Sequence, residues 1–356
     1  MKYLLLLLFF YSSFLSAQEP LVKHEIFSIP SKILNEERII YVQLPKNYHT
    51  ANFSKGSYPV IYVLDGENNF PLVATTERYG TKFLYRNFPE MIVVGIRNTD
   101  RTRDYTPTKP KVDTNLHNKS YEQGGGADAF LSFINEELKP FVKNKFRTNG
   151  FDILHGHSFG GLFAIHTLVN HNNSFDAYIA IDPSLWWDEK VVYNQAQNVF
   201  SKNNFKGKAV FVALAYEAEE NAKDRLQHGT TIQSFCEKLL PLTSQRNLNH
   251  SWKYYPDYDH GTVPLPSTFD GLAAIFNGIQ LPVKEIPKKP YLLKEQFEKL
   301  SERMQFKIVP EESLFIELVK YARKVKENEN ALYILNYGLE CYPESVKLKS
   351  MIDLKT

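Results

Sequence analysis

Residues in the middle of the chain, Gly156-His157-Ser158-Phe159-Gly160, form a Gly-x-Ser-x-Gly pentapeptide, and Gly161 follows directly. A short apolar run at residues 151–154 precedes it, and apolar residues recur at helical spacing after it. A serine at such a strand-to-helix turn sits on a strained backbone that exposes its hydroxyl for attack on a carbonyl carbon. Glycines beside it let the strand and the helix approach closely. The pattern predicts Ser158 as the nucleophile of an acyl-transfer reaction.

A histidine late in the chain supplies the general base that such a serine requires. His260 follows a strand-like run at residues 251–255 and lies in the turn-rich sequence Asp257-Tyr-Asp-His-Gly-Thr262. In α/β proteins with a serine turn of this kind, the catalytic groups follow in the chain order nucleophile, acid, base. His260 is therefore the predicted base toward Ser158 and the predicted acid toward the leaving alcohol.

A carboxylate is expected to orient His260, and the sequence offers several. Glu217 comes shortly after the penultimate strand-like run, where the acid of such a sheet is expected. Glu219 is its near neighbour, and Asp182, which follows the run at residues 177–181, occupies a second position from which the acid is sometimes supplied. A Ser-His dyad without a carboxylate is the remaining alternative. We predict Glu217 as the acid and keep the other three possibilities open.

The negative oxygen that forms when a carbonyl is attacked needs two backbone N–H donors. One is expected from Phe159, the residue after the nucleophile. The other is expected after the strand-like run at residues 58–64, where Asp65-Gly66-Glu67 allows a tight turn beside a substrate. Gly66 or Glu67 is the predicted second donor of the oxyanion hole.

The first residues of the chain are typical of a secretory signal peptide. Lys2 precedes a largely apolar run at residues 3–15, and Ala17 offers a small residue for cleavage. The run is shorter than the ~20 residues of a membrane-spanning helix. We expect residues 1–17 to be removed and the mature chain to be exported to the periplasm or the medium, without stable membrane insertion.

Charge and cysteine content exclude several kinds of partner. Lysine and arginine total 42 against 40 acidic residues, and the net charge of +2 gives no reason to expect nucleic acid as a partner. The two cysteines, Cys236 and Cys341, do not have the spacing of a metal site or of a disulfide framework. The sequence therefore predicts neither a metal nor another cofactor.

Apolar strands alternate with amphipathic helices as far as residue 280. The strand-like runs lie at residues 24–28, 38–44, 58–64, 91–96, 151–154, 177–181, 209–214 and 251–255. Helical patterns lie between the later runs, for example at residues 127–142 and 231–240. This alternation predicts an α/β domain with a mostly parallel sheet over residues 18–280.

A Pro-rich stretch at residues 281–290 predicts a linker, and the residues from 291 to 356 are helical in pattern. Two antiparallel helices that stop before Pro343 resemble a tetratricopeptide unit, although little more than one repeat is present. Since about three repeats are needed for independent stability, we predict a helical cap packed on the α/β domain. A protein partner of this tail is not identified by the sequence.

Segments in a fixed order resemble one known family. They are Tyr58-Pro-Val-Ile-Tyr-Val-Leu-Asp-Gly66, Val94-Gly-Ile-Arg-Asn-Thr-Asp-Arg-Thr-Arg-Asp-Tyr-Thr-Pro107, the glycine-flanked serine turn, Pro183-Ser-Leu-Trp-Trp187 and His260-Gly261. Over residues 24–280 the chain is similar to the putative esterase family of α/β hydrolases. That family includes enterobactin-type siderophore esterases, feruloyl and acetylxylan esterases, S-formylglutathione hydrolase and mycolyltransferases. The periplasmic siderophore esterases look nearest, and some of these work with a Ser-His dyad alone.

The resemblance implies an α/β-hydrolase fold and a serine carboxylesterase that acts on a small-molecule ester, for which a siderophore is the leading candidate. It places Arg97, Arg101 and Arg103 on a loop near the mouth of the site and Trp186 and Trp187 on another. Arginine charge and tryptophan stacking would suit an anionic aromatic ligand such as a catecholate. The structural alternatives are that Arg103 braces its loop and that one tryptophan belongs to the core.

The same resemblance leaves other activities open. A carbohydrate-linked esterase would release acetyl or feruloyl groups with the same catalytic residues. An acyltransferase would exclude water and accept an alcohol. A noncatalytic binding protein on this fold is disfavoured because both Ser158 and His260 are present.

Overall fold

The computed structural model describes residues 23–82, 84–110, 119–217 and 222–352. The predicted signal peptide and Glu219 lie outside these residues. The strands are β1 (Glu25–Ser31), β2 (Glu36–Gln43), β3 (Tyr58–Val63), β4 (Ile92–Ile96), β5 (Thr148–His157), β6 (Ala177–Ile181), β7 (Ala209–Ala215) and β8 (Asn249–Tyr255).

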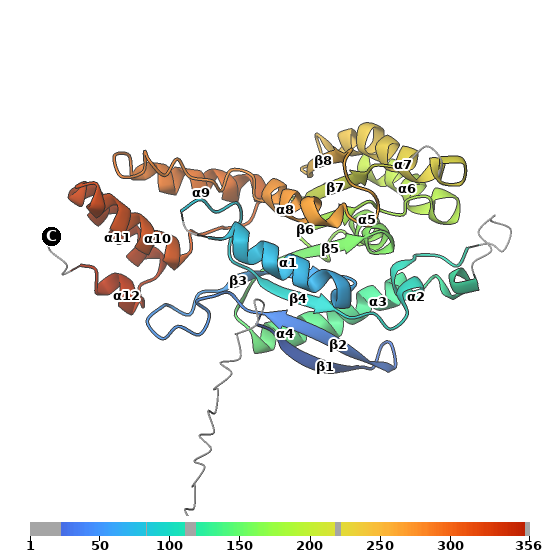
Figure 1. Ribbon diagram of the computed structural model, residues 1–356, viewed down its shortest axis with the longest axis horizontal. Helices are drawn as coiled ribbons and strands as arrows, with labels where there is room; N and C mark the ends of the chain where they lie inside the picture. Colours follow the sequence, from blue (N-terminus) through green and yellow to red (C-terminus); the bar gives the residue numbers. More distant parts are fainter. Residues whose placement is uncertain (1–22, 83, 111–118, 218–221, 353–356) are drawn as a thin grey trace, which may run out of the picture.

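The helices of the α/β part cover both faces of the sheet (Figure 1). They are α1 (Gly66–Gly80), α2 (Arg101–Tyr105), α3 (Ala127–Phe133), α4 (Lys139–Lys145), α5 (Phe159–Asn170), α6 (Trp187–Phe200), α7 (Ala222–Ser234) and α8 (Pro264–Ile275). A single π-helical turn joins α3 to α4, and a 3₁₀ turn, η1 (Lys119–Gln123), precedes α3. The helical patterns predicted from the sequence therefore correspond to helical segments.

All the strands belong to one sheet with the order β1-β2-β4-β3-β5-β6-β7-β8. β2 is antiparallel to both β1 and β4, and the remaining neighbours are parallel. Each predicted strand-like run is a strand with its ends shifted by a few residues, and the predicted α/β-hydrolase fold is confirmed. Since parallel strands point the same way, the loops after β5, β6, β7 and β8 all open at one edge of the sheet.

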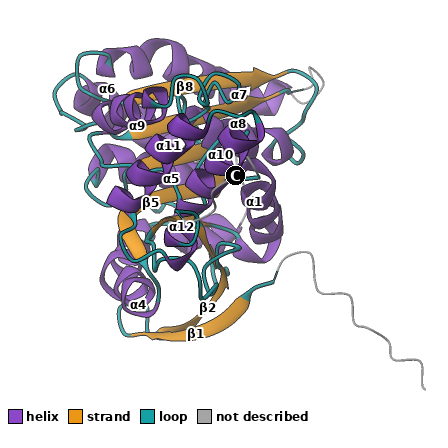
Figure 2. Ribbon diagram, turned by 90° about the vertical axis from the view of Figure 1, so that its left-hand side faces the viewer, coloured by secondary structure: helices purple, strands orange, loops and turns teal. Residues whose placement is uncertain are grey.

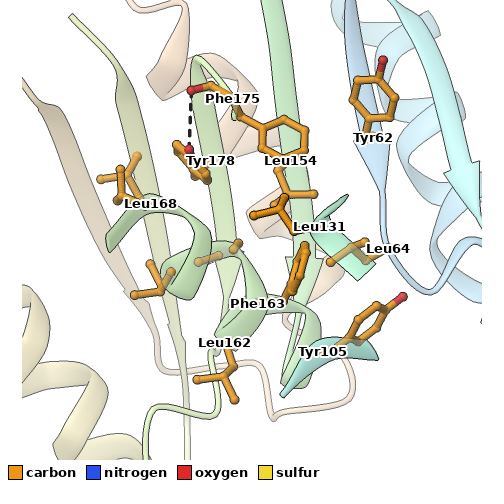
Figure 3. Packing of buried hydrophobic residues seen from close by; sticks show 14 of the residues in the cluster. Tyr62, Leu64, Tyr105, Leu131, Leu154, Leu162, Phe163, Leu168, Phe175 and Tyr178 are labelled. Carbon is orange, nitrogen blue, oxygen red and sulfur yellow. Dashed lines mark hydrogen bonds between the residues drawn. The ribbon is translucent and has the colours of Figure 1, made fainter. Parts of the chain in front are cut away.

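The sheet is buried on both faces. Along β3, Val60 and Tyr62 belong to one core and Ile61 and Val63 to the other, as expected when side chains alternate across a strand. The first core lies against α3, α4, α5 and α6 and is drawn in Figure 3, and the second lies against α1 and α8. Burial on both faces explains why the inner strands β3, β4, β6 and β7 are almost continuously apolar, whereas the edge strand β8 is partly exposed and more polar.

The C-terminal tail shares the second core with the sheet. Its helices are α9 (Tyr291–Met304), α10 (Glu312–Lys324), α11 (Asn328–Cys341) and α12 (Val346–Lys349), which gather at one end of the molecule (Figures 1 and 2). The ring of Phe306 lies 5.1 Å from that of Phe151 on β5, and Arg86 pairs with Glu311 at 2.5 Å. None of the helices in the described ranges is long and apolar enough to cross a membrane.

Removal of the tail after Pro290 is expected to yield a protein that aggregates or unfolds at a lower temperature. The truncation strips apolar cover from α8 and from the end of β5, surfaces that the tail buries in the structure. Sedimentation and a thermal melt of the truncated chain would measure this. A soluble truncation with unchanged melting temperature and ester turnover would show that the tail is an independent module.

Two leucines on α11 provide matched variants that test whether the tail contributes to the stability of the whole chain. Leu335 is fully buried, whereas Leu332 is 48% exposed. Leu335→Ala is expected to reduce the free energy of unfolding by about 2–5 kcal/mol, and Leu332→Ala by less than about 0.5 kcal/mol. If the tail and the sheet unfold together, Leu335→Ala will lower the midpoint of one unfolding transition shared by the whole chain.

Candidate active site

Ser158 stands at the turn between β5 and α5 with a backbone that residues with side chains rarely adopt. Its φ is 59° and its ψ is −116°, which costs on the order of 1–3 kcal/mol. The Ser158 N–H donates to Ile181 O at 2.9 Å, and the Ser184 N–H donates to Ser158 O at 3.1 Å. These bonds to the loop after β6 hold the strained turn at the edge of the sheet where the loops converge.

The neighbouring glycines are required by close backbone contacts. A methyl group on Gly156 would lie 2.2 Å from the Gly160 carbonyl oxygen, and one on Gly161 would lie 3.0 Å from Ile181 O. The first contact leaves no room for a side chain and the second is tighter than ordinary Cβ contacts, so the geometry of the turn favours glycine at both positions.

His260 and Asp182 form a close imidazole–carboxylate pair beside Ser158. His260 Nδ1 lies 2.6 Å from Asp182 Oδ2, and the His260 ring is 4.5 Å from that of His157, the residue before the serine. Because Nδ1 is engaged by the carboxylate, Nε2 is the ring atom available for proton transfer. The His260 side chain is 43% exposed, so a substrate can reach it.

Asp182 is almost fully buried and is held in one orientation by three donors. Its Oδ1 accepts from the Ala215 N–H at 3.0 Å, and His228 Nε2 lies 2.9 Å from the same Oδ2 that contacts His260. Burial alone would raise the pKa of Asp182, but the hydrogen bonds from His228 and His260 outweigh it and hold this pKa well below its usual value. The carboxylate is therefore ionised at neutral pH.

The structure places Asp182, and not the predicted acid Glu217, in contact with His260. Glu217 lies beyond the end of β7, with its Oε2 directed at Gly229 on α7, 3.1 Å from the position of a Cβ there. Asp182 reaches His260 because the chain turns sharply after β6, where Asp182 has a φ of 43°. The carboxylate beside His260 is thus the one from the loop after β6.

The predicted oxyanion donors lie at the starts of two helices that follow neighbouring parallel strands. Phe159 begins α5 after β5, and Gly66 and Glu67 begin α1 after β3. The first N–H groups of a helix have no partner within the helix and can bind an oxyanion. Gly66 also has a packing reason, since a Cβ there would lie 2.7 Å from Ile96 N. The donor roles of all three residues stay predictions.

Arg101 is the predicted arginine that lies nearest the serine turn. Its Nε donates to Asp65 Oδ1 at 2.6 Å, its Nη2 donates to His157 O at 3.0 Å, and its guanidinium lies 5.3 Å from the centre of the Phe159 ring. It braces the start of α1 against the serine turn while remaining one-third exposed. Arg97 is exposed at the start of the same loop.

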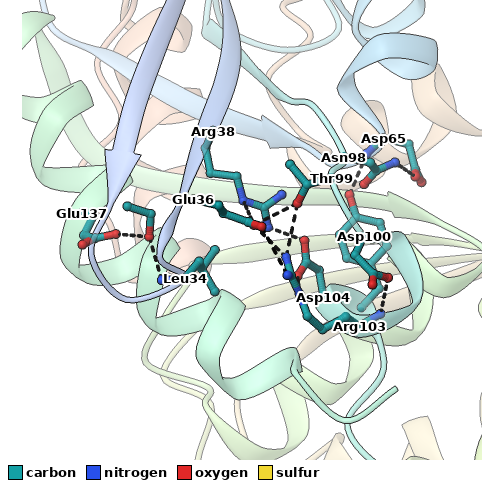
Figure 4. A network of polar contacts seen from close by, with 12 residues as sticks. Leu34, Glu36, Arg38, Asp65, Asn98, Thr99, Asp100, Arg103, Asp104 and Glu137 are labelled. Atoms are coloured by element: carbon teal, nitrogen blue, oxygen red, sulfur yellow. Dashed lines mark hydrogen bonds and ion pairs between the residues drawn. The ribbon is translucent and has the colours of Figure 1, made fainter. Parts of the chain in front are cut away.

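Arg103 takes a different role from the predicted substrate contact. It binds Glu36 and Asp104, each at 2.7 Å, and Asp104 also pairs with the fully buried Arg38 (Figure 4). These ion pairs tie α2 to β2, so Arg103 braces its loop.

The two tryptophans are distinguished by their surroundings. Trp187 is 1% exposed, and its Nε1 donates to Thr108 O at 3.1 Å, which makes it a core residue and not a substrate contact. Trp186 is half-buried, with its ring 6.1 Å from Phe159 and 6.3 Å from Tyr121. Trp186 and Tyr121 therefore provide aromatic surface beside the serine turn, and nothing in the sequence around Tyr121 pointed to it.

His228 is a further residue that the sequence analysis did not identify. It lies on α7, a mostly polar segment with no motif that indicates a catalytic role, and its side chain is 14% exposed. His228→Ala is expected to lower kcat by about ten- to a hundredfold with little change in KM, because a hydrogen bond to a charged group contributes ~1.5–3 kcal/mol. His228→Gln, whose amide can still donate to Asp182, should recover most of this loss. Steady-state kinetics would decide, and wild-type kcat in His228→Ala would exclude the role.

Comparison with known proteins gives the relatives of this chain. Residues 31–258 match the model of the family described as Putative esterase. The siderophore enterobactin esterase of Emericella nidulans is 34% identical over 176 residues, which are 44% of this chain and 58% of that protein. The ferri-bacillibactin esterase BesA of Bacillus subtilis is 28% identical over 223 residues, which are 59% of this chain and 76% of that protein.

Among solved structures, an IroE-like serine hydrolase from Shewanella oneidensis has a TM-score of 0.80 at 30% identity, covering 89% of this chain and 99% of that one. The chain spans somewhat more than half the length of the Emericella relative, 58%. The family match covers most of the α/β part, from the last residue of β1 to just beyond β8. This chain belongs to the Putative esterase family.

Proposed function

We propose that the protein is a serine carboxylesterase that hydrolyses siderophore-type esters. The observation that carries the proposal is the Asp182–His260 pair beside a serine in a strained strand-to-helix turn. Three relatives support the substrate class, since they are described as esterases of enterobactin, triacetylfusarinine C and ferri-bacillibactin.

In the proposed reaction, Ser158 Oγ attacks the ester carbonyl carbon while Nε2 of His260 takes its proton. Asp182 stabilises the imidazolium that forms, and its low pKa keeps it from taking the proton itself. The N–H groups of Phe159 and of Gly66 or Glu67 stabilise the oxyanion. His260 then protonates the leaving alcohol, and a water molecule activated by the same histidine hydrolyses the acyl-enzyme.

For substrate binding we propose Trp186, Arg97 and Arg101. Trp186 offers a half-buried aromatic face beside Phe159, and the two arginines add positive charge on the neighbouring loop. A catecholate ester combines an aromatic ring with negative charge, and both match this surface. Arg103 is left out because it pairs with Glu36 on β2, whereas Arg101 contacts the serine turn through His157 O. Trp187 is left out because it is buried.

A panel of esters tests the proposal. Cyclic tricatecholate triesters, p-nitrophenyl acetate and butyrate, and feruloylated and acetylated sugars would be compared by kcat/KM, with the products separated by chromatography. The highest kcat/KM is expected for the tricatecholate triester. Preference for the sugar esters would favour the carbohydrate-linked esterase, and ester formation with an added alcohol in place of hydrolysis would favour the acyltransferase.

We further propose that the chain is exported after removal of residues 1–17 and that the tail from residue 291 is a helical cap. The apolar run after Lys2 and the core shared by the tail and the sheet support these two proposals. Sequencing of the mature N-terminus from a fractionated cell would test the first. An N-terminus at Gln18 is expected, and an intact Met1 in the cytoplasmic fraction would contradict export.

A further inference from the structure

A second group of ionisable side chains lies at the opposite end of α5 from Ser158. His166 and His171 lie near the C-terminal end of this helix, and Asp128 projects from the first turn of α3. The helix spans about 18 Å, so the group is distinct from the candidate active site. The Nε2 atoms of His166 and His171 lie 2.8 and 3.0 Å from the same oxygen, Asp128 Oδ1.

Two imidazoles and one carboxylate are the donor set that Zn²⁺ and neighbouring first-row cations prefer. The three donor atoms lie within 4.8 Å of one another. The two Nε2 atoms converge on one carboxylate oxygen. A divalent cation can take their place there when each imidazole carries its proton on Nδ1 instead. Asp128 and His171 are 68% and 39% exposed, so an ion can enter and water can complete its coordination.

A second layer of contacts fixes the ring of the buried histidine. His166 is 5% exposed, its Nδ1 lies 3.0 Å from Asn170 Nδ2, and the Asn170 amide is held by Gln195 Oε1 at 2.9 Å. When Nε2 binds a cation, Nδ1 carries the proton and needs an acceptor. In the structure the Asn170 NH₂ group faces Nδ1, so binding of a cation at Nε2 requires the Asn170 and Gln195 amides to turn together. The Asn170 oxygen then accepts from Nδ1, as the outer partners of metal-bound histidines do.

The position of the group at the end of a helix adds favourable electrostatics for a bound cation. The C-terminal end of α5 carries partial negative charge from its unpaired carbonyl groups.

We propose that Asp128, His166 and His171 form a binding site for a divalent first-row cation, with Zn²⁺ as the best-suited ion. The bound cation ties the start of α3 to the end of the helix that begins at the nucleophile. The proposal is independent of the esterase activity.

Calorimetric titration of Zn²⁺ into the full chain in a non-chelating buffer tests it. His171→Ala and Asp128→Asn are expected to weaken binding at this site by about tenfold or more, while circular dichroism shows both variants folded. The matched control is His228→Ala, because Asp182, His228 and His260 also bring three donor atoms within 4.8 Å. His228→Ala should leave the affinity of the Asp128 site unchanged.

Co²⁺ can be used in place of Zn²⁺ as a spectroscopic probe. The visible absorption of bound Co²⁺ should appear in His228→Ala and be absent in His171→Ala. The proposal is overturned if the wild-type chain binds no Zn²⁺. It is equally overturned if binding survives both His171→Ala and Asp128→Asn, or disappears in His228→Ala alone.

Discussion

Ser158→Ala and His260→Ala are each expected to lower ester turnover by at least ~10³-fold. The first removes the atom that forms the acyl-enzyme, and the second removes the only base that the proposed mechanism uses. The thermal transition of Ser158→Ala should change little, because Ser158 Oγ has only a long contact of 3.4 Å with Ser184 Oγ. His260→Ala should lower it modestly, because the buried Asp182 carboxylate loses one hydrogen-bond partner and keeps His228 and the Ala215 N–H. Initial rates with p-nitrophenyl butyrate and a thermal melt of each variant measure the two effects.

Ser184→Ala is the matched control, since it removes the neighbouring hydroxyl without touching the proposed chemistry. It should keep most of the activity. Retention of more than about a tenth of wild-type turnover by Ser158→Ala or His260→Ala would remove that residue from the mechanism, because such a loss corresponds to only ~1.4 kcal/mol of barrier.

Asp182→Asn is expected to cut turnover by about 10²- to 10⁴-fold. An amide cannot stabilise the imidazolium formed when Ser158 gives up its proton, and its NH₂ group can face His260 Nδ1 and impose the wrong tautomer. The variant should also be less stable at neutral pH. The folded-state pKa of Asp182 is depressed, so its charged form stabilises the fold above pH ~4, and that contribution is lost only as the pH falls through the folded-state pKa.

Glu217→Gln tests the alternative position of the acid. Its carboxylate faces Gly229, so turnover should stay within about twofold of wild type. Such a change in the activation free energy is smaller than the ~1 kcal/mol that a typical hydrogen bond contributes. Loss of activity in Glu217→Gln with near-normal activity in Asp182→Asn would return the acid role to Glu217. Near-normal activity in both variants would leave a Ser158–His260 dyad.

The sheet could be predicted from the sequence because its strands are buried on both faces. Runs such as residues 58–64 and 177–181 are apolar without interruption, and each lies between turn residues or helices. The serine turn was equally clear, since close backbone contacts favour glycine at both Gly156 and Gly161. Strand ends were less accurate because they depend on pairing partners distant in the sequence.

The acid could not be chosen from the sequence, because the loops after β6 and β7 open at the same edge of the sheet. Asp182 reaches His260 from a turn in which its own φ is 43°. Sequence patterns do not report such a turn at a residue other than glycine.

The roles of the arginines and tryptophans depend on partners far along the chain. Arg103 is engaged by Glu36 across 67 positions, and Trp187 is buried against Thr108 across 79 positions. Arg101 lies in the same segment as Arg103, and Trp186 in the same segment as Trp187, with the same chemical groups. Only the tertiary structure shows which residue of each pair lies beside the serine turn.

Labelling with a fluorophosphonate, followed by intact-mass measurement and peptide mapping, tests the central claim most directly. The account predicts one adduct per chain on Ser158, no adduct in Ser158→Ala, and labelling slowed by about a hundredfold or more in Asp182→Asn. An unlabelled wild-type chain, or an adduct on any residue other than Ser158, would contradict it.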